Sequence, residues 1–168
     1  MKYRLSGLVN DSIVDGPGLR LAVFMQGCPY DCPGCHNPQT HDPLGGREAD
    51  TEDVCAKLDK NPLLAGLTLS GGEPFLQPEA AAVMAAYARQ KGLNVWAYTG
   101  STYEALRQRN DPAVDHLLAL VDVLVDGPFV LAQKSLDVPW RGSRNQRLID
   151  VQQSLQAGET VFWQAPAW

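Results

Sequence analysis

The sequence lacks both an excess of positive charge and a long apolar run. It carries 14 Lys and Arg residues against 19 Asp and Glu residues, a net charge of -5 at pH 7. Nucleic-acid binding usually depends on a basic surface, so DNA or RNA is not expected as the main partner. The longest apolar run, Ala80–Ala88, is too short to cross a bilayer, and residues 1–10 lack the apolar core of a signal peptide. We therefore expect a cytoplasmic protein without a membrane partner.

Cysteine is scarce as well, and its distribution does not suggest a disulfide framework. Three of the 4 cysteines lie in the stretch "GCPYDCPGCHN", residues 27–37. Cys55 stands apart on the apolar face of a predicted helix and is interpreted as a buried structural residue. A local group of thiols in a reducing compartment is more typical of metal or redox chemistry than of disulfides. The sequence therefore predicts a metal site within residues 28–35.

Repeats, low-complexity segments and long linkers are also absent, so residues 1–168 are expected to form a single domain. A chain of this length can bury a core without disulfides or structural metals. The final segment, 151–168, cannot be assigned from the sequence. Its Trp163 and Trp168 are expected either to pack back on the body of the protein or to meet a partner.

Strand-like and helix-like stretches alternate along the rest of the chain. Predicted strands span residues 19–26, 64–70, 93–99 and 122–127. Predicted helices span residues 51–61, 78–92, 101–110 and 112–121. Thr51 is the expected N-cap of the first helix, and residues 40–49 and 71–77 are expected to form turns and loops.

This alternation predicts an α/β fold with a mostly parallel sheet and right-handed crossovers. A full eight-unit barrel usually takes about 250 residues, so we expect an incomplete, TIM-like barrel with flanking helices, open on one side. In such sheets ligands bind at the carboxyl ends of the strands. The cysteine loop, the glycine segment 70–74 and residues 98–99 all lie at the ends of predicted strands.

Cys28, Cys32 and Cys35 provide three ligands where a closed metal site needs four. Thiolates are soft ligands, and three of them on a short loop can hold three irons of a 4Fe-4S cube while the fourth iron has no protein ligand. A vacant position is typical of a reactive centre rather than a structural one. A ferredoxin-type electron carrier would need a fourth cysteine at its expected spacing.

A structural zinc site, with the three thiols completed by His36, His41 or Cys55, is the alternative interpretation. Zinc ligands usually form two pairs that are well separated in the sequence, and this chain has no second pair. A zinc or iron–sulfur binding module without catalytic activity nevertheless remains a second hypothesis.

The segment "SGGEP", residues 70–74, follows a predicted strand. Gly71 and Gly72 allow the backbone to approach a ligand closely, and Glu73 offers an acceptor for an ammonium group. Alone, the segment would be an ordinary turn. Its position at a strand end, downstream of the cysteines, favours a ligand site.

The C-x3-C-x2-C loop resembles that of radical S-adenosyl-L-methionine (SAM) enzymes, and "CPYDCPGCHN" is similar to the form found in glycyl-radical enzyme activases. Gly34 stands where the superfamily often has an aromatic residue, and the resulting "CPGC" resembles the activators of anaerobic ribonucleotide reductase. "WRGSRNQR", residues 140–147, is similar to the C-terminal signature of the same activators. "DGPGLR", residues 15–20, matches their early Gly-Pro-Gly turn. The resemblance covers about residues 7–150.

The resemblance implies the remaining site residues. The Gly71-Gly72-Glu73 segment would bind the amino group of SAM, and Asp126 would lie near its ribose. From the residues themselves, the hydroxyls of Tyr98 and Thr99 at a predicted strand end are placed to reach the ribose or sulfonium region, and the alternative is a simple strand-to-helix turn with Ser101 or Thr99 as the cap. Several relatives carry Lys where this chain has Pro128, so a carboxylate contact by that Lys is not expected here.

The segment 140–147 carries two candidate arginines, and the alternative interpretation of this segment is a solvated basic turn. Arg141 or Arg144 has the guanidinium geometry to bind the carboxylate of SAM. Asn145 and Gln146 are expected to hold the loop through amide hydrogen bonds.

The resemblance implies an oxidoreductase with a 4Fe-4S cluster and SAM as cofactors and with no catalytic side chain of its own. It would cleave SAM reductively to a 5′-deoxyadenosyl radical, which abstracts hydrogen from a glycine of a partner glycyl-radical enzyme. The expected partner is anaerobic ribonucleotide reductase, and a flavodoxin or ferredoxin is the expected electron donor. A small radical SAM synthase acting on a metabolite is the alternative enzyme, although it would not account for "WRGSRNQR".

Overall fold

The computed structural model describes residues 1–30, 32–35 and 37–165. Its seven strands are β1 (Lys2–Ser12), β2 (Arg20–Met25), β3 (Arg47–Asp50), β4 (Gly66–Gly71), β5 (Asn94–Tyr98), β6 (Val123–Asp126) and β7 (Arg147–Asp150). Its α-helices are α1 (Thr51–Lys60), α2 (Pro78–Gln90), α3 (Tyr103–Gln108), α4 (Pro112–Leu118) and α5 (Val151–Ala157). Three short 3-10 helices are η1 (Pro38–Thr40), η2 (Pro74–Leu76) and η3 (Leu131–Gln133).

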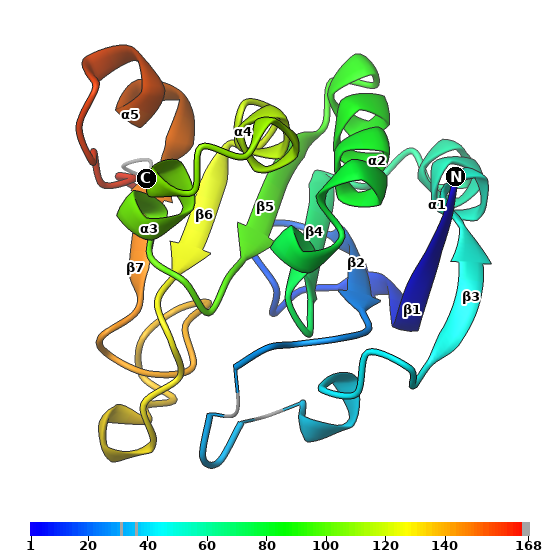
Figure 1. Cartoon of the computed structure of the whole chain (residues 1–168). Helices are drawn as coiled ribbons and strands as arrows, with labels where there is room; N and C mark the ends of the chain where they lie inside the picture. The colour runs from blue at the N-terminus through cyan, green and yellow to red at the C-terminus, as the bar shows by residue number, and fades with distance from the viewer. Residues whose placement is uncertain (31, 36, 166–168) are drawn as a thin grey trace.

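The strands form one open sheet in the order β3-β1-β2-β4-β5-β6-β7. The central strands β2, β4, β5 and β6 pair in parallel. The flanking pairs β1–β2, β1–β3 and β6–β7 are antiparallel. The predicted α/β fold, an incomplete barrel of mostly parallel strands that is open on one side, is confirmed. In Figure 1 the helices lie above the sheet, and the long loops gather below, where β4, β5 and β6 end.

Three strands and one helix were not predicted. β3, with the sequence READ, and β7, with RLID, are only four residues long and carry no alternating apolar pattern. β1 contains polar residues and shifts register against β2. These strands form because a neighbouring strand supplies the hydrogen bonds, which local sequence patterns do not reveal. α5 falls in the segment that the sequence left unassigned.

The main core lies between the sheet and the five α-helices. Alternate residues of the central strands, such as Leu67 and Leu69 in β4, point to this side and are fully buried. α2 begins with Pro78, presents an alanine-rich face to the core and ends before Gly92, whose φ of +77° suits the turn after a helix. The predicted helix 78–92 is confirmed within two residues at its C-terminal end.

The N-cap predicted for the first helix was wrong by one residue. Asp50, not Thr51, caps α1, because its carboxylate accepts a hydrogen bond from the backbone N–H of Glu52 and its backbone is still extended.

Among the described residues no helix has the length and apolar character needed to cross a bilayer.

A second, smaller cluster covers the opposite face of the sheet. Trp96 of β5 makes edge-to-face contacts with Trp140 and Trp163, with ring centroids 5.2 Å away in both cases. Trp163 therefore packs back on the body of the protein, one of the two outcomes expected for the C-terminal segment. Trp168 lies outside the described residues.

Candidate functional site

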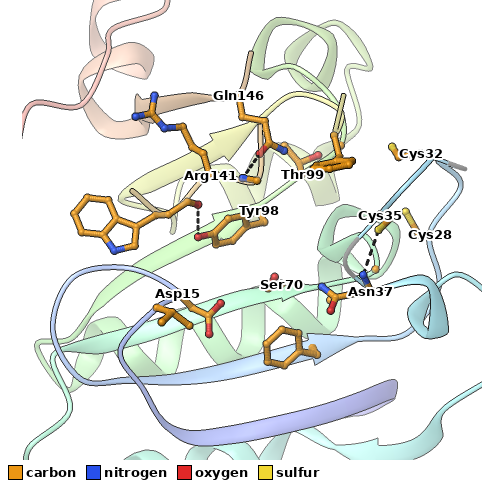
Figure 2. Close-up of a pocket in the computed structure, with 18 of the residues that line it drawn as sticks. Asp15, Cys28, Cys32, Cys35, Asn37, Ser70, Tyr98, Thr99, Arg141 and Gln146 are labelled. Atoms are coloured by element: carbon orange, nitrogen blue, oxygen red, sulfur yellow. Dashed lines mark hydrogen bonds between the residues drawn. The ribbon is translucent and has the colours of Figure 1, made fainter. Parts of the chain in front are cut away.

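A cavity of about 720 Å³ lies on this second face, at the carboxyl ends of the central parallel strands. Its wall combines segments that are distant in the sequence: residues 12–15 before β2, the cysteine loop, residues 70–72 at the end of β4, residues 98–100 at the end of β5, and residues 140–142. Figure 2 shows Cys28, Cys32 and Cys35 at one end of this pocket, with Arg141 and Asp15 toward the other end. The fold thus gathers most of the predicted motifs at one site.

All three cysteines of the loop line the pocket as free thiols, and none forms a disulfide. The thiol of Cys28 donates to the carbonyl of Tyr30, with 3.5 Å between sulfur and oxygen, and burial raises the pKa of this thiol to about 11. The sulfur of Cys35 accepts the backbone N–H of Asn37 at 3.4 Å. Hydrogen bonds to ligand sulfurs are among the features that set the potential of an iron–sulfur cluster.

The donor set fits a 4Fe-4S cluster, because Cys28, Cys32 and Cys35 line one pocket as free thiols and can each bind a different iron. Among the described residues, no group of three or more His, Cys, Asp or Glu side chains is arranged to hold one metal ion. An iron–sulfur cube needs no such group, because each thiolate binds a different iron. Of the side chains considered as a fourth zinc ligand, His41 lines the pocket and Cys55 lies on α1 outside it. His36 lies outside the described residues.

Gly71 and Gly72 both line the pocket, but their lack of side chains has a structural cause as well. A Cβ atom on Gly71, whose φ is +93°, would lie 2.4 Å from the backbone nitrogen of Met25. A Cβ on Gly72 would lie 2.2 Å from the carbonyl oxygen of Gly27, next to the first cysteine. The two glycines therefore let the end of β4 pack against the base of the cysteine loop.

Glu73 does not line the pocket. Its side chain is buried, and its carboxylate accepts hydrogen bonds from the backbone N–H groups of Phe75 (3.1 Å) and Gly100 (2.8 Å) and from the hydroxyl of Thr99 (2.8 Å). Desolvation raises the pKa of Glu73 above its usual value, although these donors favour the ionised form. Through these hydrogen bonds the carboxylate of Glu73 joins the ends of β4 and β5. This buried position does not match the expected contact between Glu73 and an ammonium group in the pocket.

Replacing Glu73 by glutamine is expected to destabilise the protein more than it weakens ligand binding. The amide nitrogen of glutamine cannot accept a hydrogen bond, so at least one buried donor loses its partner, at a cost of about 2 kcal/mol. For a chain of this size, Tm should fall by about 4–8 °C. Thermal unfolding of the metal-free protein measures the effect, with Glu159→Gln at an exposed position as the control. An unchanged Tm together with weaker SAM binding would assign Glu73 a direct ligand contact instead.

Tyr98 and Thr99 line the pocket with their hydroxyls already bonded inside the protein. The hydroxyl of Tyr98 donates to the carbonyl of Trp140 at 2.6 Å, and the hydroxyl of Thr99 donates to Glu73. Burial raises the pKa of Tyr98, so this side chain stays neutral. The two residues shape the wall between the cysteines and the segment 140–147.

Asp126 lies at the end of β6, as predicted, but it is not part of the pocket wall. Its fully buried carboxylate accepts hydrogen bonds from Arg147 Nε at 3.0 Å and from the backbone N–H of Tyr103 at 2.7 Å. The same pairing raises the pKa of Arg147. Asp126 thus holds β7 and the start of α3 in place, and its expected position beside the ribose does not fit this geometry.

The segment 140–147 separates its two candidate arginines. Arg141 lines the pocket, whereas Arg144 is exposed and lies 3.9 Å from Asp137 in an ion pair. The expectation that Asn145 and Gln146 hold the loop is confirmed. Asn145 Nδ2 donates to the carbonyl of Pro128 at 2.8 Å, and the amide of Gln146 bonds to the backbone of residues 127, 142 and 143.

Sequence reasoning missed several residues of the pocket wall. Asp15 supplies the one carboxylate among the described lining residues, and Ser70, Asn37 and Trp140 also face the cavity. The turn "DGPGLR" was the available signal for Asp15. Arg20 of the same turn is buried and donates to the carbonyl of Pro17 at 2.9 Å, which holds the turn against the sheet.

Comparisons with known proteins show which family this chain resembles. The family described as "4Fe-4S single cluster domain" matches residues 14–149. The anaerobic ribonucleoside-triphosphate reductase-activating proteins of Vibrio cholerae and Salmonella typhimurium are 34% and 36% identical to this chain. Each alignment covers 80% of the chain, and 89% and 90% of the two relatives.

More distant similarities extend beyond these proteins. The pyruvate formate-lyase-activating enzyme of Clostridium pasteurianum is 33% identical over 71% of this chain and 52% of its own length. Among solved structures, QueE from Escherichia coli aligns over 61% of this chain and 54% of its own, with 17% identity and a TM-score of 0.48.

Proposed function

Because this chain belongs to the family of anaerobic ribonucleoside-triphosphate reductase-activating proteins, we propose that it is a radical SAM enzyme that generates a glycyl radical in an anaerobic ribonucleotide reductase. The observation that carries the proposal is the meeting of three free thiols and the glycine segment 70–72 in one cavity at the strand ends. A 4Fe-4S cluster and SAM are the cofactors that this donor set and this family support.

Cys28, Cys32 and Cys35 would hold three irons of the cluster and leave the fourth for SAM. With both cofactors bound, the cluster would supply the electron for reductive cleavage of SAM, and this radical chemistry would serve to abstract hydrogen from a glycine Cα of the partner. Gly71 and Gly72 form the wall beside the cysteine loop and let a ligand approach the backbone there.

The other end of the pocket carries charges of both signs. Arg141 is the one permanent cation and Asp15 the one carboxylate among the described lining residues. Because they lie away from the cysteines in Figure 2, we assign them to the part of the ligand, or of the partner, that is farther from the cluster. Under this assignment, Arg141 does not bind the carboxylate of a SAM molecule that is held at the cluster.

The rim of the pocket suits a protein substrate. Ile13, Val14 and Leu136 line it with exposed fractions of 74%, 71% and 90%. Large apolar side chains gathered around an opening mark a surface that another molecule covers. A glycine-bearing loop of the reductase could enter over these residues.

A flavodoxin or ferredoxin as electron donor stays a prediction.

The test is anaerobic reconstitution of the full chain with iron and sulfide, followed by dithionite and SAM. We expect a four-iron cluster, release of 5′-deoxyadenosine, and a glycyl radical signal in electron paramagnetic resonance (EPR) spectra when the reductase is added. Cluster binding without 5′-deoxyadenosine would refute the enzyme. Stoichiometric zinc without iron would favour a binding module, and SAM cleavage with no radical on the reductase would favour a synthase.

A further inference from the structure

Gln26 occupies the position where the chain leaves the sheet for the cysteine loop. It follows the last residue of β2, precedes Gly27 and Cys28, and has an exposed fraction of 2%. Its side-chain Nε2 donates to the carbonyl of Gln39 at 3.0 Å and to the carbonyl of Asp42 at 2.7 Å. The side-chain amide of Gln26 thus binds residues 39 and 42, in the segment that follows the cysteine loop.

The backbone closes the loop at the same place. The N–H of Gly27 donates to the carbonyl of Thr40 at 2.6 Å, and the N–H of Cys28 donates to the carbonyl of His41 at 3.1 Å. The carbonyls bound by the Gln26 side chain are the ones directly before and after this pair. Four consecutive carbonyls, from residue 39 to residue 42, are therefore fixed by the strand end that carries the first cysteine.

The chain beyond the loop is shaped around the Gln26 amide. A Cβ atom on Gly45 would lie 2.7 Å from Nε2, and a Cβ on Gly46 would lie 3.0 Å from Oε1. The Oε1 atom is buried and has no hydrogen-bond partner among the described residues, so the two donated bonds fix the orientation of the amide. The available space and the positions of the two carbonyl acceptors both suit a planar amide at this position.

We propose that Gln26 is a positioning residue for the cluster: its side chain closes the base of the cysteine loop and so fixes where Cys28 and Cys35 present their sulfurs. The proposal rests on the proposed function in one respect, that these cysteines bind the cluster. Groups that orient metal ligands without touching the metal typically contribute 10- to 100-fold to metal affinity.

Gln77 provides a matched control for the test. Its carboxamide accepts the N–H of Arg4 at 2.8 Å and donates to the carbonyls of Arg4 and Gln26, each at 3.0 Å. These bonds tie η2 to β1 and β2, and none of them reaches residues 27–46. Gln77→Met and Gln26→Met therefore remove the same chemical group and differ in whether the cysteine loop is held.

Two measurements compare the variants. In reconstituted protein, Gln26→Met should lose iron to a chelator about 10- to 100-fold faster than wild type, whereas Gln77→Met should stay within about 3-fold. In metal-free protein, hydrogen exchange at the amides of Gly27 and Cys28 should be faster in Gln26→Met only, because these amides lose their fixed acceptors. A role limited to overall stability would lower Tm in both variants and leave local exchange alike.

Equal iron release and equal exchange in the two methionine variants would overturn the proposal. If Gln26→Met does not fold, Gln26→Asn replaces it. This variant keeps the amide but shortens its reach, and an iron-release rate equal to that of wild type would also overturn the proposal. The exchange measurement uses neither metal nor SAM, so it tests Gln26 even if the wild-type chain fails to hold a cluster and the proposed function falls.

Discussion

The Cys35→Ala variant is expected to lose its four-iron cluster and to release 5′-deoxyadenosine more than about 100-fold more slowly than wild type. Cys35 lines the pocket with Cys28 and Cys32, and its sulfur also accepts the N–H of Asn37. Removing one of three thiolates leaves a second iron without a protein ligand. This loss is greater than that of a group that only orients a metal ligand, whose removal typically lowers metal affinity or activity 10- to 100-fold. Iron content, the EPR signal of the reduced cluster and product release measure the effect.

Cys55→Ala is the matched control for this variant. It also removes one thiol, but Cys55 lies half-buried on α1, outside the pocket, where burial raises the pKa of its thiol. Full iron content and activity are expected for Cys55→Ala. Iron loss in both variants, or in neither, would contradict the assignment of the cluster to residues 28–35.

The Gly72→Ala variant is expected to be strongly destabilised. The added methyl group would lie 2.2 Å from the carbonyl oxygen of Gly27, a backbone atom that also accepts the N–H of Glu73 at 2.8 Å. The end of β4 and the base of the cysteine loop would have to separate, at a cost of about 3 kcal/mol or more. Thermal unfolding should show Tm lowered by about 6–12 °C, and the folded fraction should hold less iron.

Gly7→Ala is the control for this second variant, because a Cβ atom there meets no other atom within 4 Å. Its Tm is expected to stay close to that of wild type. If Gly72→Ala unfolds at the wild-type temperature and loses only SAM affinity, the expectation is contradicted. Glycine would then be required at position 72 for ligand binding only, and the close approach to Gly27 would not affect stability.

The sequence predicted the parts of the fold that have a local pattern. The strands of the parallel centre and helices such as α2 were found because apolar periodicity, Pro78 and Gly92 mark them. The antiparallel strands β1, β3 and β7 were missed because pairing partners decide them. β3, for example, has three charged residues among its four. It pairs with β1, from which β2 and the cysteine loop separate it in the sequence.

The candidate site was predictable at the level of motifs and less so at the level of side-chain roles. The cysteine loop and the glycine segment meet as expected, because the carboxyl ends of parallel strands share one edge of the sheet. The contacts expected of Glu73 and Asp126 depended on which way each carboxylate turns. Backbone N–H groups, Thr99 and Arg147 draw them into the interior, and the sequence carries no signal for that choice.

The packing of Trp140 against Trp96 and Trp163 turns part of the pocket wall into an optical reporter. Three of the 4 tryptophans of the chain share one cluster, and Trp140 also lines the cavity. A ligand that displaces water from this wall alters the surroundings of an indole ring. The intrinsic fluorescence of the metal-free protein therefore offers a label-free titration of pocket occupancy, independent of any catalytic turnover.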